Sequence, residues 1–276
     1  MGNIWFAAGT KHAGRTSVVV LPGTAMRATS YATMATQISE RGSSALVLEY
    51  PDSSSIGSTE LATYVSAELD KLPEQYGIGS ALLVGHSLGG RIAALVANRR
   101  HPLVQGFATV ATSIPFWKDF GGDEPPTTAS SPSNQDRLTL EMFEMLRTGK
   151  FTAAESIGGL GAVSVPSLVV GLDNDLLAPS SAVRRFSKYL DPLLSSMHVV
   201  PADQPEPNPS VHSTWLGNPS DILSLIEKWW VKVRHDPVAM ALQETGLRVQ
   251  HVRARGVLAA EGRQDLARVI FQAAQR

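Results

Sequence analysis

The sequence predicts an α/β fold in which a mostly parallel central sheet carries helices on both faces. Short β-rich runs alternate with longer stretches of helical periodicity along most of the chain. The runs at 18–21 and 81–84 are wholly apolar, as expected of strands that are buried on both faces. A chain of 276 residues accommodates one large domain of this kind with a small insertion.

Turn and capping residues set the limits of the individual elements. Pro22-Gly23 ends the second strand, Gly42 ends the first helix, and Ser58-Thr59-Glu60 supplies capping chemistry for the second helix. We expect strands at residues 4–8, 18–21, 45–50, 81–84, 107–110, 166–171 and 197–200. We expect helices at residues 31–41, 58–72, 91–100, 138–146, 180–189 and 219–233.

The regular alternation breaks between residues 112 and 163. This stretch contains a polar segment rich in Pro, Ser and Thr, followed by a helical run. Loops at the carboxyl ends of parallel strands form the ligand crevice of an open sheet, so we expect an insertion there to cap the crevice. The alternative is a plain surface excursion with no part in binding.

These patterns divide the chain into a core, a cap and an extension. Residues 1–111 and 164–235 form the predicted α/β core, and residues 112–163 form the cap insertion. Residues 236–276 have helical periodicity interrupted by glycines and are predicted to be a C-terminal helical extension. The extension either packs back onto the domain or makes the contact of a homodimer.

A serine lies in a glycine-rich turn between an apolar run and a helix, in the segment GHSLGG at residues 85–90. Such a turn forces strained dihedrals on Ser87, and its small neighbours avoid a clash there. The N–H of Leu88 opens the helix, so it points to the same spot with the positive end of the helix dipole behind it. A phosphate-binding turn is the alternative, but its glycine spacing differs. We interpret His86 as structural, because successive side chains diverge.

This segment resembles the nucleophile elbow of the α/β-hydrolase-fold esterases, lipases and thioesterases. The order of strands and helices around it is similar to that fold over about residues 16–233. The resemblance implies a serine hydrolase that cleaves a carboxylic ester or thioester through an acyl-enzyme on Ser87, with no metal and no organic cofactor. Epoxide hydrolases and haloalkane dehalogenases of this fold are set aside, because they have a carboxylate nucleophile at the elbow.

The same resemblance implies a catalytic histidine after the last strand of the sheet. His212 follows the run at 197–200 and precedes the helix at 219–233, in a predicted loop that four prolines stiffen. His198 lies inside a predicted strand, and His235 and His251 follow the long terminal helix. His212 is therefore the predicted base, although Val211 stands where the family usually has glycine.

Two carboxylates follow the strand at 166–171 and compete for the role of the triad acid. In the family, the acid precedes by four residues a proline that starts the next helix, and Asp175 has this relation to Pro179. Counted from Gly171, Asp175 stands one residue late against the common pattern and Asp173 one residue early. The resemblance favours Asp175, and we expect Asp173 to cap or hydrogen-bond the turn.

The second oxyanion donor is expected in the loop after the strand at 18–21. The segment LPGT at residues 21–24 is similar to the family's His-Gly-x loop, so the implied donors are the N–H groups of Thr24 and Leu88. A plain Pro-Gly turn is the alternative. In the predicted cap, Phe116, Trp117 and Phe143 either bind an apolar part of the substrate or bury the cap against the core.

Composition excludes several other classes of function. With 24 basic and 25 acidic residues the net charge is −1, which gives no electrostatic footprint for nucleic acid. The absence of cysteine excludes disulfides, Cys-based metal sites and thiol nucleophiles. No apolar run is long enough to span a membrane, and the first residues lack the pattern of a signal peptide. We therefore expect a cytoplasmic protein that acts on a small-molecule acyl substrate.

Two rival functions remain open from the sequence. An acyltransferase or a biosynthetic cyclase would use the same three residues and the same acyl-enzyme, passing the acyl group to an acceptor other than water. A non-catalytic protein of this fold would use the crevice only to bind a ligand.

Overall fold

A seven-stranded sheet forms the centre of the computed structural model, which describes residues 2–8, 16–122, 136–156, 158–160, 163–192, 194–201 and 204–234. Within these residues the strand order is β1-β3-β2-β4-β5-β6-β7. β1 pairs antiparallel with β3, and the other neighbouring pairs are parallel. The predicted α/β class with a mostly parallel sheet is confirmed. The strands are β1 (Ile4–Phe6), β2 (Ser17–Leu21), β3 (Ala45–Val47), β4 (Ala81–His86), β5 (Val104–Val110), β6 (Ser167–Leu172) and β7 (Ser195–Val200).

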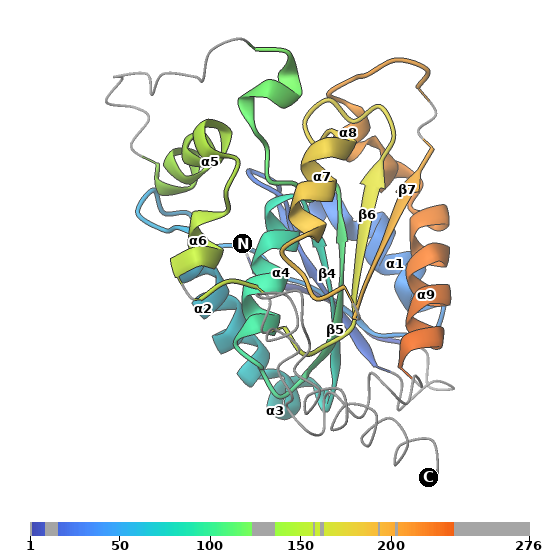
Figure 1. The fold of residues 1–276 in the computed structure, drawn as a ribbon. Helices are drawn as coiled ribbons and strands as arrows, with labels where there is room; N and C mark the ends of the chain where they lie inside the picture. The colour runs from blue at the N-terminus through green and yellow to red at the C-terminus, as the bar shows by residue number, and fades with distance from the viewer. Residues whose placement is uncertain are drawn as a thin grey trace, which may run out of the picture.

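Helices cover both faces of this sheet. α1 (Ala32–Glu40) and α9 (Ser220–Val233) lie together on one face, and α2 (Ser58–Asp70) and α4 (Leu88–Asn98) lie together on the other (Figure 1). α7 (Ser180–Ser187) packs against β6 and β7. The shorter elements are η2 (Ala28–Tyr31), α3 (Leu72–Tyr76), η3 (Trp117–Phe120), α5 (Arg137–Thr148), α6 (Thr152–Ser156), α8 (Val211–Thr214) and η5 (Trp215–Gly217).

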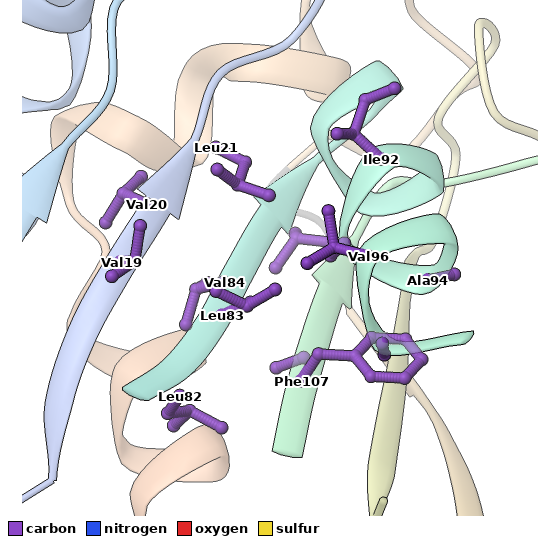
Figure 2. Close-up of a cluster of buried hydrophobic side chains, with 14 of the residues drawn as sticks. Val19, Val20, Leu21, Leu82, Leu83, Val84, Ile92, Ala94, Val96 and Phe107 are labelled. Carbon is purple, nitrogen blue, oxygen red and sulfur yellow. The ribbon is translucent and has the colours of Figure 1, made fainter. Parts of the chain in front are cut away.

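β2 and β4 lie at the centre of the core. Both strands are buried along their whole length (Figure 2). Val18, Leu82 and Val84 lie toward α9 on one face of the sheet, and α4 packs on the other face. The two strands are the apolar runs from which we predicted buried strands. Burial on both faces follows because helices cover the sheet from both sides.

The ends of most predicted elements differ from the structure by one to three residues, as in β3 and α4. β3 ends at Val47, three residues before the predicted limit, because Glu49 turns to long-range partners: its N–H donates to Asn3, and its carboxylate accepts the N–H of Ala28. α4 begins at Leu88 instead of Arg91, directly after Ser87, so the turn between β4 and α4 is tighter than predicted.

The predicted capping of α2 by its own residues is met only in part, because the carboxylate of Glu60 accepts the N–H of Gly57 but no N-cap side chain caps the helix. The N-cap residue is Gly57, which has no side chain to cap the helix. The first N–H of α2, that of Ser58, donates instead to both carboxylate oxygens of Glu141, each at 3.1 Å. Because Glu141 belongs to α5, this contact ties α5 to the start of α2, 83 residues away in the sequence.

The division into core, cap and extension stays a prediction. α5 and α6 belong to the predicted cap and lie beyond α2, toward the end of the sheet where the strand arrows point (Figure 1). Residues 123–135 of the cap and 236–276 of the extension lie outside the described residues. No helix in the part of the chain that the structure describes is long and apolar enough to cross a membrane.

The strand order reverses at β2, which has β3 on one side and β4 on the other. At such a switch point, the loops that follow the two strands diverge and leave a crevice at the carboxyl end of the sheet. The loop after β2 carries Gly23 and Thr24, and the turn after β4 carries Ser87 and Leu88. The fold thus brings these two segments to the same edge.

Close packing of the turn after β4 against β2 requires glycine at position 89. A Cβ built on Gly89 would collide with the backbone oxygens of Leu21 and Pro22. We expect Gly89→Ala to lower the free energy of unfolding by about 1–3 kcal/mol, because backbone atoms must shift to accept the methyl group. Urea denaturation checks this, with Gly79→Ala as control, since a Cβ there meets nothing within 4 Å. Equal free energies of unfolding for the two variants would show that the turn at Gly89 does not pack closely against the end of β2.

Candidate active site

Ser87 has a backbone conformation that L-residues rarely adopt, with φ 51° and ψ −115°. Hydrogen bonds from neighbouring segments hold it: its N–H donates to the carbonyl of Val110 at 2.9 Å, and its own carbonyl accepts the hydroxyl of Thr112 at 3.0 Å. The Ser87 side chain itself is half-buried, between the end of β4 and the start of α4. The strain that we expected from the glycine-rich turn is present at this residue.

His212 and Asp175 form a hydrogen-bonded pair at the same end of the sheet. Asp175 Oδ2 lies 2.8 Å from His212 Nδ1, although the residues are 37 positions apart in the sequence. The other oxygen, Oδ1, accepts the N–H groups of Leu177 and Ala178 at 2.8 and 2.9 Å. Asp175 is 3% exposed. A carboxylate accepts the Nδ1 proton of its partner, which leaves Nε2 of His212 free to accept another proton.

The rival acid has a different role in the turn. Asp173 is exposed, and its carboxylate accepts the N–H of Asn174. Asn174 has φ 60° and its carbonyl accepts the N–H of Asn208, which links the loop after β6 to the segment that leads to His212. The turn therefore directs Asp175, and not Asp173, toward the histidine.

The predicted loop around His212 is helical at the histidine itself. His212 lies in α8, a single turn of helix that continues into η5. Nearby carbonyl groups accept the backbone N–H groups of this turn. The N–H of His212 donates to the carbonyl of Pro209, and that of Thr214 donates to the carbonyl of Ser210. Of the other candidate bases, His198 is exposed on β7, and His235 and His251 lie outside the described residues.

The two predicted oxyanion donors have N–H groups without protein acceptors in the described part of the chain. Leu88 N–H opens α4, and Thr24 N–H follows Gly23 in the loop after β2. The N–H of Gly23 is engaged, because it donates to the hydroxyl of Tyr31 at 2.8 Å. A Cβ on Gly23 would stand 3.4 Å from Cβ of Ser87, so this loop packs against the serine.

The hydroxyl of Ser87 makes no hydrogen bond with His212 among the residues that the structure describes. Both residues adjoin His86: Ser87 follows it in the chain, and the ring of His212 lies 5.0 Å from its ring. Contacts between a nucleophile and its base are often long without substrate and shorten only in the reacting complex.

A cavity of about 580 Å³ adjoins the turn, lined by Gly23, Thr24 and Leu88 at one end. The rest of its wall consists of residues 25–27, residues 49–54 after β3, Ile56 and Leu61, and Asp136 with the first turn of α5. Arg27 bonds Glu49 and Asp52 at 3.0 and 3.1 Å across this wall. The cavity thus joins the free N–H groups of the site to a wall that carries charged and hydroxyl groups.

Comparison with known proteins identifies the fold. A model described as the alpha/beta hydrolase family matches residues 17–147. No curated protein matches the chain. A solved structure of a Paleococcus ferrophilus monoacylglycerol lipase is similar, with a TM-score of 0.57, 14% identity, and 83% of this chain and 98% of that chain covered. The protein has the α/β-hydrolase fold.

Other α/β hydrolases of known structure are similar to the same degree. MenH from S. aureus has a TM-score of 0.55 and 16% identity over 84% of this chain and 98% of its own. A thermophilic esterase from Thermogutta terrifontis has a TM-score of 0.55 and 14% identity over 83% of this chain and 93% of its own. The predicted resemblance to this superfamily is confirmed at the level of the fold.

The three aromatic residues that we predicted for substrate binding lie away from the 580 Å³ cavity of this α/β-hydrolase fold. The rings of Phe116 and Trp117 meet edge-on at 5.6 Å, and the guanidinium of Arg185 lies 5.6 Å from the ring centre of Phe116. Phe143 is half-buried on α5. A role for these residues in binding stays a prediction.

No group of three His, Cys, Asp or Glu side chains that could hold a metal ion occurs in the described ranges of this α/β-hydrolase fold. Its polar groups at the carboxyl end of the sheet are a serine, a histidine–carboxylate pair and backbone N–H groups. Chemically, this set can transfer a proton and hold a negative oxygen.

His86 has a larger part in the site than its sequence position indicated. It is 2% exposed, and its Nε2 lies 2.9 Å from the carbonyl oxygen of His212. Burial, together with the neighbouring His212, lowers the pKa of His86 from 6.5 to about 3. His86 is therefore neutral at pH 7, and because a carbonyl only accepts, its Nε2 carries the proton.

This burial predicts a pH dependence of stability. The unfolded state takes up a proton on His86 below pH 6.5, whereas the folded state does so only near pH 3. Stability is therefore complete above pH 6.5 and is lost as the pH falls toward 3. Between pH 7.5 and 5, we expect wild type to lose about 2 kcal/mol more than His86→Gln. Urea unfolding at both pH values measures the difference.

The exposed His198 provides the control for this experiment. His198→Gln is expected to lose stability with pH as wild type does, because this substitution leaves the buried His86 in place. If wild type and His86→Gln lost the same free energy of unfolding between pH 7.5 and 5, His86 could not be a buried neutral histidine.

Proposed function

We propose that this protein is a serine hydrolase that cleaves a carboxylic ester or thioester through an acyl-enzyme on Ser87. The observation that carries the proposal is the buried Asp175–His212 hydrogen bond at the sheet edge where the strained turn presents Ser87. A buried carboxylate that orients an imidazole prepares the imidazole to take a proton from a hydroxyl nucleophile at the same end of the sheet.

In the first half of the reaction, His212 Nε2 takes the hydroxyl proton while Oγ of Ser87 attacks the acyl carbon. Asp175 keeps the Nδ1 proton in place and stabilises the imidazolium that forms. The carbonyl oxygen becomes an oxyanion, to which the N–H groups of Leu88 and Thr24 donate. When the tetrahedral intermediate collapses, the imidazolium returns its proton to the leaving alcohol or thiol, and the acyl group stays on Ser87.

In the second half, water replaces the leaving group. His212 takes a proton from the water molecule as its oxygen attacks the acyl carbon, and the same two N–H groups hold the oxyanion. Collapse then releases the carboxylic acid, and the proton on His212 returns to Oγ of Ser87. No step requires a metal or an organic cofactor.

Two further observations support an ester as the substrate class. Similar structures include proteins named as a monoacylglycerol lipase and an esterase. The 580 Å³ cavity begins at Thr24 and Leu88, where the oxyanion would form, and extends away from it. One half of a small acyl substrate would occupy this cavity with its carbonyl at the two N–H groups.

The two neighbouring aspartates provide a matched test of the triad. We expect Asp175→Asn to lower kcat/KM for an activated ester by about 10⁴-fold, because the amide fixes the wrong imidazole tautomer. Asp173→Asn should stay close to wild type, since its carboxylate bonds only the turn. The assay is the hydrolysis of p-nitrophenyl esters of rising chain length, alongside acyl-thioesters, with Ser87→Ala as the blank.

Three outcomes would contradict the proposed function or a part of it. A fluorophosphonate probe that fails to label wild type at Ser87 would exclude the nucleophile. Equal losses from the two aspartate variants would exclude the assignment of the acid. An acyl-enzyme that forms but transfers its acyl group to an added alcohol or amine faster than to water would identify an acyltransferase.

A further inference from the structure

A chain of buried hydrogen bonds connects the loop after β2 to the backbone of His212. The N–H of Gly23 donates to the hydroxyl of Tyr31 at 2.8 Å. The same hydroxyl lies 2.8 Å from Nδ1 of His86, and Nε2 of His86 lies 2.9 Å from the carbonyl oxygen of His212. The side chains of Tyr31 and His86 are almost completely buried, so water does not replace these bonds.

The direction of every bond in this chain is fixed by its two ends. The carbonyl of His212 can only accept, so Nε2 of His86 donates to it. The neutral ring then has a lone pair on Nδ1, which accepts the proton of the Tyr31 hydroxyl in preference to Sδ of Met26, a weaker acceptor 3.2 Å from that hydroxyl. The Tyr31 oxygen accepts the N–H of Gly23 in turn. A single tautomer of His86 satisfies all three bonds, and reversing any one bond would leave a buried group unpaired.

We propose that His86 and Tyr31 are positioning residues that set the backbone of His212 and the oxyanion loop relative to each other. This role rests on the proposed serine hydrolase function. Asp175 holds the ring of His212, but its contact does not fix the backbone that carries the ring. His86 fixes that backbone from β4, the strand that ends at the nucleophile itself.

The other end of this chain of hydrogen bonds acts on the oxyanion loop, the loop after β2 that carries Gly23 and Thr24. Tyr31 engages the N–H of Gly23, whereas the next N–H, that of Thr24, has no acceptor in the described part of the protein. Trp215 Nε1 also donates to the carbonyl of His212, at 3.1 Å, but it comes from the adjoining turn. Of these two donors to that carbonyl, only His86 connects the base to the loop after β2.

The inactivation kinetics of a fluorophosphonate probe test this role without knowledge of the natural substrate. We expect Tyr31→Phe and His86→Leu each to lower the limiting rate of Ser87 labelling, kinact, by about 10- to 100-fold, with KI little changed. The reason is that a misplaced base and oxyanion loop slow the reaction but do not remove the pocket. His86→Gln, whose amide both donates and accepts, should recover most of the lost rate.

A double variant and a matched control separate positioning from a general loss of structure. If the chain of hydrogen bonds acts as one unit, its two substitutions should not add. The limiting labelling rate of the double variant, Tyr31→Phe with His86→Leu, should then be no more than about threefold below that of the slower single variant. Tyr189→Phe is the control. The hydroxyl of Tyr189 also accepts a backbone N–H, that of Phe151, but it takes no part in the hydrogen bonds between Gly23 and His212. This variant should label at the wild-type rate. Circular dichroism confirms that each variant is folded.

The outcomes distinguish this proposal from the proposed function. If wild type is not labelled at Ser87, the serine hydrolase itself is excluded. If wild type is labelled and folded Tyr31→Phe keeps its rate, the positioning role is excluded while the hydrolase stands. Multiplicative losses in the double variant would also overturn the coupling. Should His86→Leu not fold, Tyr31→Phe and His86→Gln still decide the question.

Discussion

The strained backbone of Ser87 is the constraint around which the rest of the structure is arranged. A non-glycine residue at such dihedrals costs about 1–3 kcal/mol and persists only where its surroundings fix it. Here the surroundings are the carbonyl of Val110, the hydroxyl of Thr112 and the close approach of Gly89 to the end of β2. These contacts lie at the buried end of the core, where β2, β4, β5 and α4 pack together.

A second constraint is the buried charge of Asp175. An unpaired carboxylate in such a place would be very unfavourable, so its partners determine how the loops after β6 and β7 fold. Two N–H groups from its own turn and Nδ1 of His212 satisfy it. The short parallel bridge between Asp175 and Asn208 holds the two loops together. The orientation of His212 thus follows from satisfying the carboxylate.

Local signals in the sequence were sufficient for the strands and for the serine. β2 and β4 are runs of adjacent apolar residues between turn residues, so their burial could be predicted without knowledge of the fold. Ser87 could be singled out because the strain, the glycines and the following helix all lie within a few residues. The relation of Asp175 to Pro179 is equally local, and the structure directs that carboxylate toward His212.

Features that depend on distant partners could not be predicted in the same way. Glu49 ends β3 early through contacts with Asn3 and Ala28, and Glu141 caps α2 from 83 residues away. Tyr31 reaches His86 across 55 residues, and nothing in its own surroundings in the sequence indicates that contact. The structural role assigned to His86 from the divergence of neighbouring side chains did not anticipate its bond to the backbone of His212, which exists only after β4 and α8 have packed.

The contact of Glu141 with α2 also bears on how the cavity is built. A carboxylate that accepts an N–H at a helix N-terminus makes a strong hydrogen bond, because the acceptor is charged. The helix dipole stabilises the same negative charge. The neighbouring ion pair of Arg137 with Glu60 is half-exposed on both sides and adds little. Of these two polar contacts, that of Glu141 contributes more to holding α5 against α2, and the first turn of α5 lines the cavity together with Leu88. The loop tied to Tyr31 lines the same cavity, so two of the segments around it are each held by a buried or half-buried hydrogen bond from a distant part of the sequence.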